Sequence, residues 1–304
     1  NLTLRTQFGV DYTQSTADMK SYPSFIGNNG SGAAGRSSYT TVNLTITNTI
    51  NYKFDINRWH QFNVMLGQEG VDYRSEGFQV VTTGHNNDVF TQLSSGTRAS
   101  SWANSSSSHA YLSFFARGEY NFNERYYADF SLRSDASSRF GKEGRWATFW
   151  SLGFMWNMRK EKFMQRVNKW LTNAQIALST GTSGNSSIPD YDHLALVGSG
   201  ANYVGSAGIA PASQGNEKLS WEQLWTSNIA LHFGFFHRIN ADLELYHKKT
   251  TNMLMLVPQS YVNNGFGTRW DNVGAMVNIG AEASLSFDVI RTESFSWNIN
   301  TNAS

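Results

Sequence analysis

The sequence predicts an all-β fold, namely a segment of an antiparallel transmembrane β-barrel. Three observations predict it: apolar and polar residues alternate along many segments, the links between these segments alternate between long and short, and the composition is rich in strand-forming residues. Aromatic residues make up 14% of the chain and charged residues 15%, and there are only 4 prolines in 304 residues. Aromatic residues are enriched in strands, whereas proline is confined to strand edges and bulges.

The alternation has a period of two residues, which places neighbouring side chains on opposite faces of a strand. Along 239–248, Leu243 and Leu245 fall on one face, and Asp242 and Glu244 fall on the other. The same pattern recurs along 42–54, 110–119 and 126–135. Each segment is long enough to cross a bilayer as a tilted strand, which takes about 9–11 residues.

The pattern predicts about eleven strands in the whole chain. They cover roughly 2–12, 38–54, 60–72, 109–121, 126–136, 147–158, 173–182, 219–235, 239–256, 273–289 and 295–303. The long links are 13–37, 73–108, 137–146, 183–218 and 257–272, and the short ones are 55–59, 122–125, 159–172, 236–238 and 290–294. Barrels of outer membranes have short periplasmic turns and long extracellular loops, so this asymmetry favours a barrel over a soluble sandwich.

No stretch of about 18 apolar residues is present, so we expect no transmembrane helix. One short link, Met158–Leu171, has apolar residues at helical spacing and predicts a small amphipathic helix at the periplasmic rim; a helix packed on a soluble core is the alternative. The chain starts at Asn1 without a signal peptide and ends at Ser304 within a predicted strand. We therefore expect residues 1–304 to be part of one barrel domain of a longer polypeptide.

Composition and motifs argue against several classes of function. The formal net charge is +1, without the basic excess typical of a nucleic-acid-binding surface, and the absence of cysteine excludes disulfides and thiolate metal sites. No metalloprotease, hydrolase or phosphate-loop motif occurs. The run Asp190–His193 offers oxygen ligands for a cation, but a solvated polar loop is the favoured interpretation. We expect no enzyme activity, no cofactor and no metal.

The most specific motifs of the chain are short segments in its central and C-terminal parts. They are YYADFSLRSDASSRFG at 126–141, Arg145-Trp146, Trp156, Glu161-Lys162-Phe163, IALSTGTSGN at 176–185, NEKLSWE at 216–222, YHKKT at 246–250, NVGAM at 272–276 and Gly280-Ala281-Glu282. Together they resemble transporters of the SusC/RagA type, which are TonB-dependent proteins of the outer membrane. These segments follow the family's order and approximate spacing over about 126–282. The chain departs at Trp150, where the family prefers proline, at Ile279, where it often has lysine, and at Asn216-Glu217, where a proline usually intervenes.

The resemblance implies about half of a barrel of about 22 strands with a plugged lumen. The plug domain and the C-terminal strands would then lie outside this chain. It also implies import of a large nutrient, a glycan oligomer or a peptide, across the cell outer membrane. The implied partners are the lipid bilayer, a SusD-like surface lipoprotein, and a TonB complex acting through the plug. We expect no nucleic-acid partner. The alternatives are a secreted all-β glycan-binding or glycan-cleaving protein and a passive porin.

Candidate ligand contacts are charged residues near the outer rim and aromatic or acidic residues in the long links. Aromatic rings in such loops can stack on sugars or peptide side chains, and polar lumen residues tune selectivity. The candidates are Asp135, Arg139, Tyr191, Asp192, Tyr203 and Trp270. The charged strand residues Asp129, Arg133, Asp242 and Glu244 are interpreted as a solvated, salt-bridged wall rather than as a catalytic pair.

Overall fold

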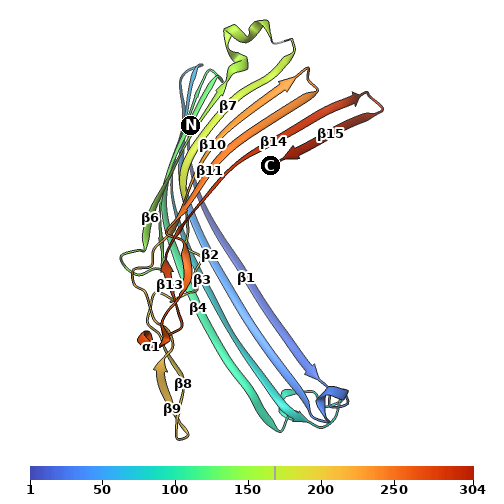
Figure 1. Cartoon of the computed structure of the whole chain (residues 1–304), viewed down its shortest axis with the longest axis vertical. Helices are drawn as coiled ribbons and strands as arrows, with labels where there is room; N and C mark the ends of the chain where they lie inside the picture. Colours follow the sequence, from blue (N-terminus) through green and yellow to red (C-terminus); the bar gives the residue numbers. More distant parts are fainter. Residues whose placement is uncertain (168) are drawn as a thin grey trace. The chain divides into compact units, whose positions relative to one another are not determined.

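The computed structural model describes residues 1–167 and 169–304, except for the side chains at 200, 203 and 207. Its main feature is an 11-stranded antiparallel sheet in the order β1-β2-β3-β4-β5-β6-β7-β10-β11-β14-β15 (Figure 1). The strands are β1 Leu2–Ser21, β2 Gly32–Asn57, β3 His60–His85, β4 Arg98–Phe122, β5 Tyr126–Ser137, β6 Trp146–Asn157, β7 Leu171–Asn185, β10 Glu222–Phe235, β11 Ile239–Thr251, β14 Ala275–Arg291 and β15 Ser296–Ala303. Each strand pairs with the one that follows it in the sheet, so the sheet is an up-and-down meander and confirms the predicted fold class.

Two small hairpins lie in the longest links. They pair β8 Val197–Tyr203 with β9 Ser206–Pro211, and β12 Leu254–Pro258 with β13 Thr268–Asn272, and the four-residue helix α1 Tyr261–Asn264 lies between the second pair. Figure 1 shows both hairpins at one end of β7 and the β6–β7 turn at the other. The described chain divides into two compact units, one of Asn1–Arg5, Asn48–Gln68 and Leu112–Ser304, the other of Thr6–Thr47 and Glu69–Tyr111.

Strand register aligns like residues in rows across the sheet. Leu245 of β11 pairs with Ile229 of β10 and Ala281 of β14, and Ile229 in turn pairs with Leu178 of β7. The neighbouring position on the other face carries polar contacts. There the Asp242 carboxylate lies 2.7 Å from His232 Nδ1 and accepts a hydrogen bond of 3.2 Å from the Ser284 hydroxyl. In this part of the sheet the strands therefore present one apolar and one polar face.

The apolar face is not covered by any other layer of the described chain. Leu178, Ile229 and Leu245 remain 43%, 46% and 44% exposed in the middle of their strands. Rows of exposed leucine, isoleucine and phenylalanine are unfavourable in water, because each side chain would gain about 1.5–3 kcal/mol from burial. The apolar surroundings that these rows require are those of the lipid bilayer.

Strands β1–β4 are longer than the sequence predicts. The links predicted at 13–37 and 73–108 are wrong, because the connections cover only residues 22–31 and 86–97. Strand β4 includes the serine run at 105–108, which carries no apolar alternation. Ladder hydrogen bonds join backbone groups and need no particular side chain, so a polar strand that pairs well is not recognised by hydrophobic period.

The predicted amphipathic helix at Met158–Leu171 is also wrong in type. The turn forms two short 3-10 helices, η3 Met158–Lys160 and η4 Lys162–Arg166, in which Glu161 N donates to Met158 O and Met164 N donates to Glu161 O. An α-helix this short would not recover its nucleation cost, and 3-10 turns connect closely spaced strand ends instead. The described part of the chain contains no helix both long and apolar enough to cross a membrane.

Strand glycines make room for aromatic rings of neighbouring strands. A Cβ atom added at Gly184 of β7 would collide with the ring of Phe149 of β6, which is buried. A Cβ atom added at Gly118 of β4 would meet no described atom within 4 Å. A ring lying over a strand glycine compensates for the missing side chain and fixes the register of the pair.

We expect Gly184→Ala to destabilise the barrel of the full-length protein by roughly 1–3 kcal/mol, since overpacking displaces the Phe149 ring. Urea unfolding in detergent measures this change. Gly118→Ala is the matched control and should leave the unfolding midpoint unchanged. Equal effects of the two variants would contradict the packing argument.

Candidate functional site

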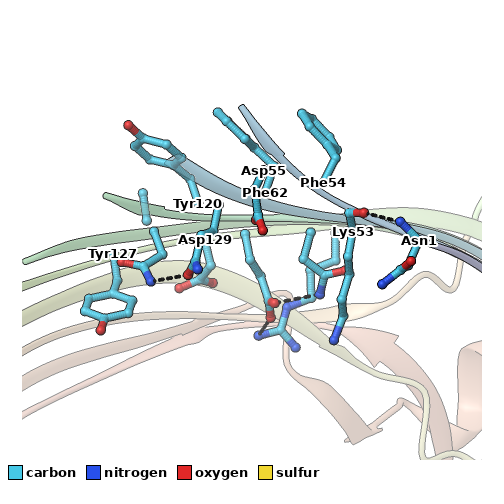
Figure 2. A pocket seen from close by; sticks show the side chains of 14 residues that line it. Asn1, Lys53, Phe54, Asp55, Phe62, Tyr120, Tyr127 and Asp129 are labelled. Atoms are coloured by element: carbon cyan, nitrogen blue, oxygen red, sulfur yellow. Dashed lines mark hydrogen bonds and ion pairs between the residues drawn. The ribbon is translucent and has the colours of Figure 1, made fainter. Parts of the chain in front are cut away.

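The polar face of β2–β5 forms an open pocket of about 600 Å³ (Figure 2). Two cross-strand pairs line it, in which Asn63 Nδ2 donates to Glu119 at 2.8 Å and Asn121 Nδ2 donates to Gln61 at 2.8 Å. Within β4, Arg117 forms an ion pair with Glu119 at 2.8 Å. Figure 2 shows Tyr127 and Tyr120 projecting to opposite sides of the sheet. Charges on this wall are matched, as expected for a polar surface facing another polar body or water.

A buried cluster lies where the links 138–145 and 186–221 meet beyond the ends of β5–β10. Phe140 and Leu219 are completely buried, and the ring of Trp221 lies 5.4 Å from that of Phe140 and 5.7 Å from that of Phe149. The Trp221 indole N–H donates to the backbone oxygen of Arg145 at 2.9 Å. Aromatic burial of this kind fixes loops that would otherwise move independently.

Polar contacts add a further set of ties between the links. Arg139 Nε donates to Asp190 Oδ1 at 2.8 Å, and the two side chains are only 20% and 10% exposed. The Asn272 side chain binds both backbone groups of Ser220, accepting from its N–H and donating to its carbonyl, each at 2.8 Å. The link 252–274 is thereby attached to the end of the link 186–221. We call residues 138–145, 186–221 and 252–274 together the loop cluster.

Two aspartates of the loop cluster have opposite electrostatic environments. Burial raises the pKa of Asp192, the nearby Asp190 charge adds to this rise, and a hydrogen bond from Trp270 opposes it. Burial also favours the neutral form of Asp271, but hydrogen bonds outweigh it and the pKa is lowered. The groups that donate hydrogen bonds to the Asp271 carboxylate are Arg269 Nη2 at 2.7 Å, the Asn272 N–H at 3.0 Å and Asn216 Nδ2 at 3.1 Å.

Several buried polar atoms of the loop cluster have no hydrogen-bond partner among the described residues: His193 Nδ1, Gln214 Oε1 and Arg269 Nε. Buried polar groups are nearly always satisfied by protein, water or ligand, so unused capacity concentrated in one place indicates a surface suited to a polar ligand. No group of three or more histidine, aspartate or glutamate side chains in metal-binding arrangement occurs within residues 1–167 and 169–304.

The structure brings some of the candidate ligand contacts together. A hydrogen bond joins Asp192 to Trp270. Tyr191, at a positive φ of 71°, lies in the chain between Asp192 and Asp190, which forms the ion pair with Arg139. Arg139 enters the same cluster through Asp190.

Two other candidates stand apart. Asp135 belongs to β5 and forms a 2.7 Å ion pair with Arg133, and the side chain of Tyr203, in β8, lies outside the described residues. Sequence reasoning missed Asn216, Asp271 and Asn272 as contact-forming residues, and it interpreted Asp190 as part of a solvated loop, whereas Asp190 forms an ion pair with Arg139. Asn216 and Asn272 begin two of the segments that carry the family resemblance, and this position was the available signal.

A family model described as TonB dependent receptor-like, beta-barrel matches residues 1–304, the whole chain. The chain belongs to this family. It is a barrel segment of the cell outer membrane, and the resemblance to TonB-dependent transporters of the SusC/RagA type is confirmed.

Individual relatives of this TonB-dependent barrel match between about two thirds and nearly all of its length. TonB-dependent receptor SusC of Bacteroides thetaiotaomicron is 29% identical over 310 residues, 99% of this chain and 30% of that protein. A TonB-dependent receptor of Formosa agariphila is 32% identical over 197 residues, 64% of this chain and 19% of that protein. In the structure of the RagAB peptide transporter, one chain superposes with a TM-score of 0.93 at 33% identity, covering 99% of this chain and 34% of that one. This chain thus spans about a third of the length of SusC and of the RagAB chain, and its match covers a smaller share of the Formosa receptor.

We expect Arg139→Gln to destabilise the loop cluster by roughly 3 kcal/mol, because it removes the guanidinium charge that lies 2.8 Å from the buried Asp190 carboxylate. Hydrogen exchange of residues 186–221 in the full-length protein reports this loosening. Arg36→Gln removes an arginine from the exposed ion pair with Asp18 and serves as the control, with little expected change. Unchanged exchange in Arg139→Gln would contradict the assigned role of the ion pair.

The two aspartate pKa shifts predict opposite effects of charge removal at pH 7. The raised pKa of Asp192 means that its charge opposes loop packing above that pKa, so packing strengthens as pH falls through it. The lowered pKa of Asp271 means that its charge supports packing, and this support is lost as pH falls through that pKa. At pH 7, Asp192→Asn should keep or increase the hydrogen-exchange protection of 252–274, and Asp271→Asn should decrease it. Loss of protection in both variants would contradict the assignment.

Proposed function

We propose that the full-length protein containing this chain imports a large nutrient, a glycan oligomer or a peptide, across the outer membrane in a TonB-dependent manner. The observation that carries the proposal is the superposition of 99% of this chain, at 33% identity, on a chain of the RagAB peptide transporter. The similarity to SusC extends over the same share of the chain. A likeness that includes links as well as strands supports a shared use of the barrel, since loops carry most binding function.

In this proposal the chain is part of one barrel domain, whose remaining strands and plug are supplied by the rest of the polypeptide. The sheet described here ends at β1 and β15, each of which pairs on one side only. Unpaired strand edges are not tolerated in the hydrocarbon of a bilayer, because every backbone polar group there needs a partner. Further strands of the same barrel would provide these partners.

We propose the loop cluster as the place where the barrel contacts its ligand. Trp270 and Tyr191 offer aromatic surface for stacking on a sugar ring or a peptide side chain, and Asp192 offers a hydrogen-bond acceptor beside Trp270. Arg139 holds this arrangement through Asp190. Asp135 and Tyr203 complete the proposed set as contacts from the barrel wall and the β8–β9 hairpin.

The proposed partners follow from the same relatives. A SusD-like surface lipoprotein would cap the barrel and deliver the ligand, and a TonB complex would act on the plug. Strand β2 has 26 residues, whereas about 9–11 suffice to cross a bilayer. The part of the strand that extends beyond the membrane would be available to contact such a partner. The mechanism comprises binding, gating and release without covalent chemistry, in keeping with a family of receptors and transporters.

The alternative of a secreted all-β glycan-binding or glycan-cleaving protein is disfavoured by one observation. Rows of exposed Leu178, Ile229 and Leu245 cross the sheet without a covering layer, and a secreted protein would bury them. A passive porin is distinguished by experiment, since its transport would not need TonB.

The test is uptake by cells that carry the full-length transporter and its surface lipoprotein. We expect uptake of either labelled peptides or labelled glycan oligomers, abolished by deletion of TonB, and about tenfold weaker ligand binding by Trp270→Ala. Phe163→Ala removes an exposed ring from the β6–β7 turn, at the opposite end of the strands, and should leave ligand binding normal. Uptake that persists without TonB, or no uptake of either ligand class, would refute the proposal.

A further inference from the structure

A second pocket lies at the opposite end of the strands from the loop cluster. It has a volume of about 540 Å³, and residues of three turns line it: Trp59 of the β2–β3 turn, Asn123 to Arg125 of the β4–β5 turn, and Arg159 to Glu161 of the β6–β7 turn. Backbone hydrogen bonds hold the turns together, from Asn123 N to Trp59 O and from Asn157 N to Arg125 O, each at 2.7 Å. In this family the short turns lie on the periplasmic side of the membrane.

The two carboxylates of the pocket already have partners. Glu161 accepts hydrogen bonds from the Tyr126 hydroxyl at 2.7 Å and the Trp156 indole at 3.3 Å, and Arg125 lies 3.8 Å away. The hydrogen bond from Tyr126 lowers the pKa of Glu161 and keeps it an anion. Glu124 forms an ion pair with Lys160.

Arg159 is the basic residue of the pocket that is not paired with a carboxylate. Its Nε is buried and has no hydrogen-bond partner among the described residues, and no acidic side chain within residues 1–167 and 169–304 forms an ion pair with it. A guanidinium presents its N–H groups in a planar fork that fits two oxygens of a phosphate. An arginine without a protein partner that lines an open pocket is therefore suited to bind an anionic oxygen ligand.

The surroundings of the pocket identify where the anion comes from. Residues 158–170 contain five basic residues and one acidic residue, Glu161. Phe163, in the same turn, is 64% exposed, and Trp59 and Trp170 are also exposed. Exposed aromatic rings beside basic side chains are typical of a membrane interface, where rings lie at headgroup depth and cations meet lipid phosphates.

We propose that this pocket binds the phosphate headgroup of an anionic phospholipid from the periplasmic leaflet, with Arg159 as its principal contact. The exposed Phe163 ring lies beside the acyl chains of the same lipid layer. Binding holds the three turns together at the barrel rim. This inference rests on the membrane orientation of the family and is independent of which nutrient is imported.

The test is native mass spectrometry of the full-length transporter released from nanodiscs that contain phosphatidylglycerol. We expect a bound phosphatidylglycerol in the wild type and about tenfold weaker binding in Arg159→Gln. Lys162→Gln removes the same charge from an exposed position of the same turn that does not line the pocket, and should bind as the wild type does. Normal heat-modifiable migration of both variants in gels establishes that their barrels are folded.

Three results would overturn the proposal. Equal lipid occupancy in Arg159→Gln and the wild type would exclude Arg159 as the contact. Equal losses in Arg159→Gln and Lys162→Gln would indicate general attraction to a charged surface. Displacement of the lipid by millimolar inorganic phosphate would identify a site for free phosphate instead.

Discussion

Backbone hydrogen bonding in a medium without water is the constraint on which the rest of this structure depends. Within a bilayer each N–H and C=O group needs a partner in the protein, and an antiparallel meander provides one for every strand between two neighbours. Once the ladder is continuous, the period of two assigns Leu243 and Leu245 to one face and Asp242 and Glu244 to the other. The exposed apolar rows and the matched polar wall are both consequences of this single arrangement.

The two ends of the strands are under a different constraint. Water is available there to backbone groups, so side-chain contacts determine the structure. At one end, Phe140, Leu219 and Trp221 form a buried core, and the Arg139–Asp190 ion pair and Asn272 join the long links around it. At the other end, short turns carry aromatic and basic residues suited to an interface. The barrel is thus uniform in its wall and specialised at its rims, where we propose that ligands, partners and lipid headgroups bind.

The sequence predicts the wall well because alternation is a local property. The eleven strands of the sheet appear close to where the period of two places them, with two departures. Strands β1–β4 extend through polar segments such as 105–108, where both faces are hydrophilic, and the strand predicted at 239–256 ends at Thr251, because residues 254–256 pair in the separate β12–β13 hairpin. Contacts in the loop cluster are not local. The hydrogen bond between Asp192 and Trp270 joins two links far apart in the chain, and no spacing rule predicts it. The helix expected at Met158–Leu171 became two 3-10 turns because the strands on either side constrain it.

The most direct test of the central claim is a scan of spin labels along β11 in the full-length transporter in lipid. This chain contains no cysteine, so single labels can be introduced at positions 242–245. The account predicts that labels at Leu243→Cys and Leu245→Cys collide with oxygen dissolved in the bilayer, whereas those at Asp242→Cys and Glu244→Cys collide with a water-soluble nickel chelate. Equal access of the chelate to all four positions would contradict a membrane-facing sheet and with it the transporter assignment.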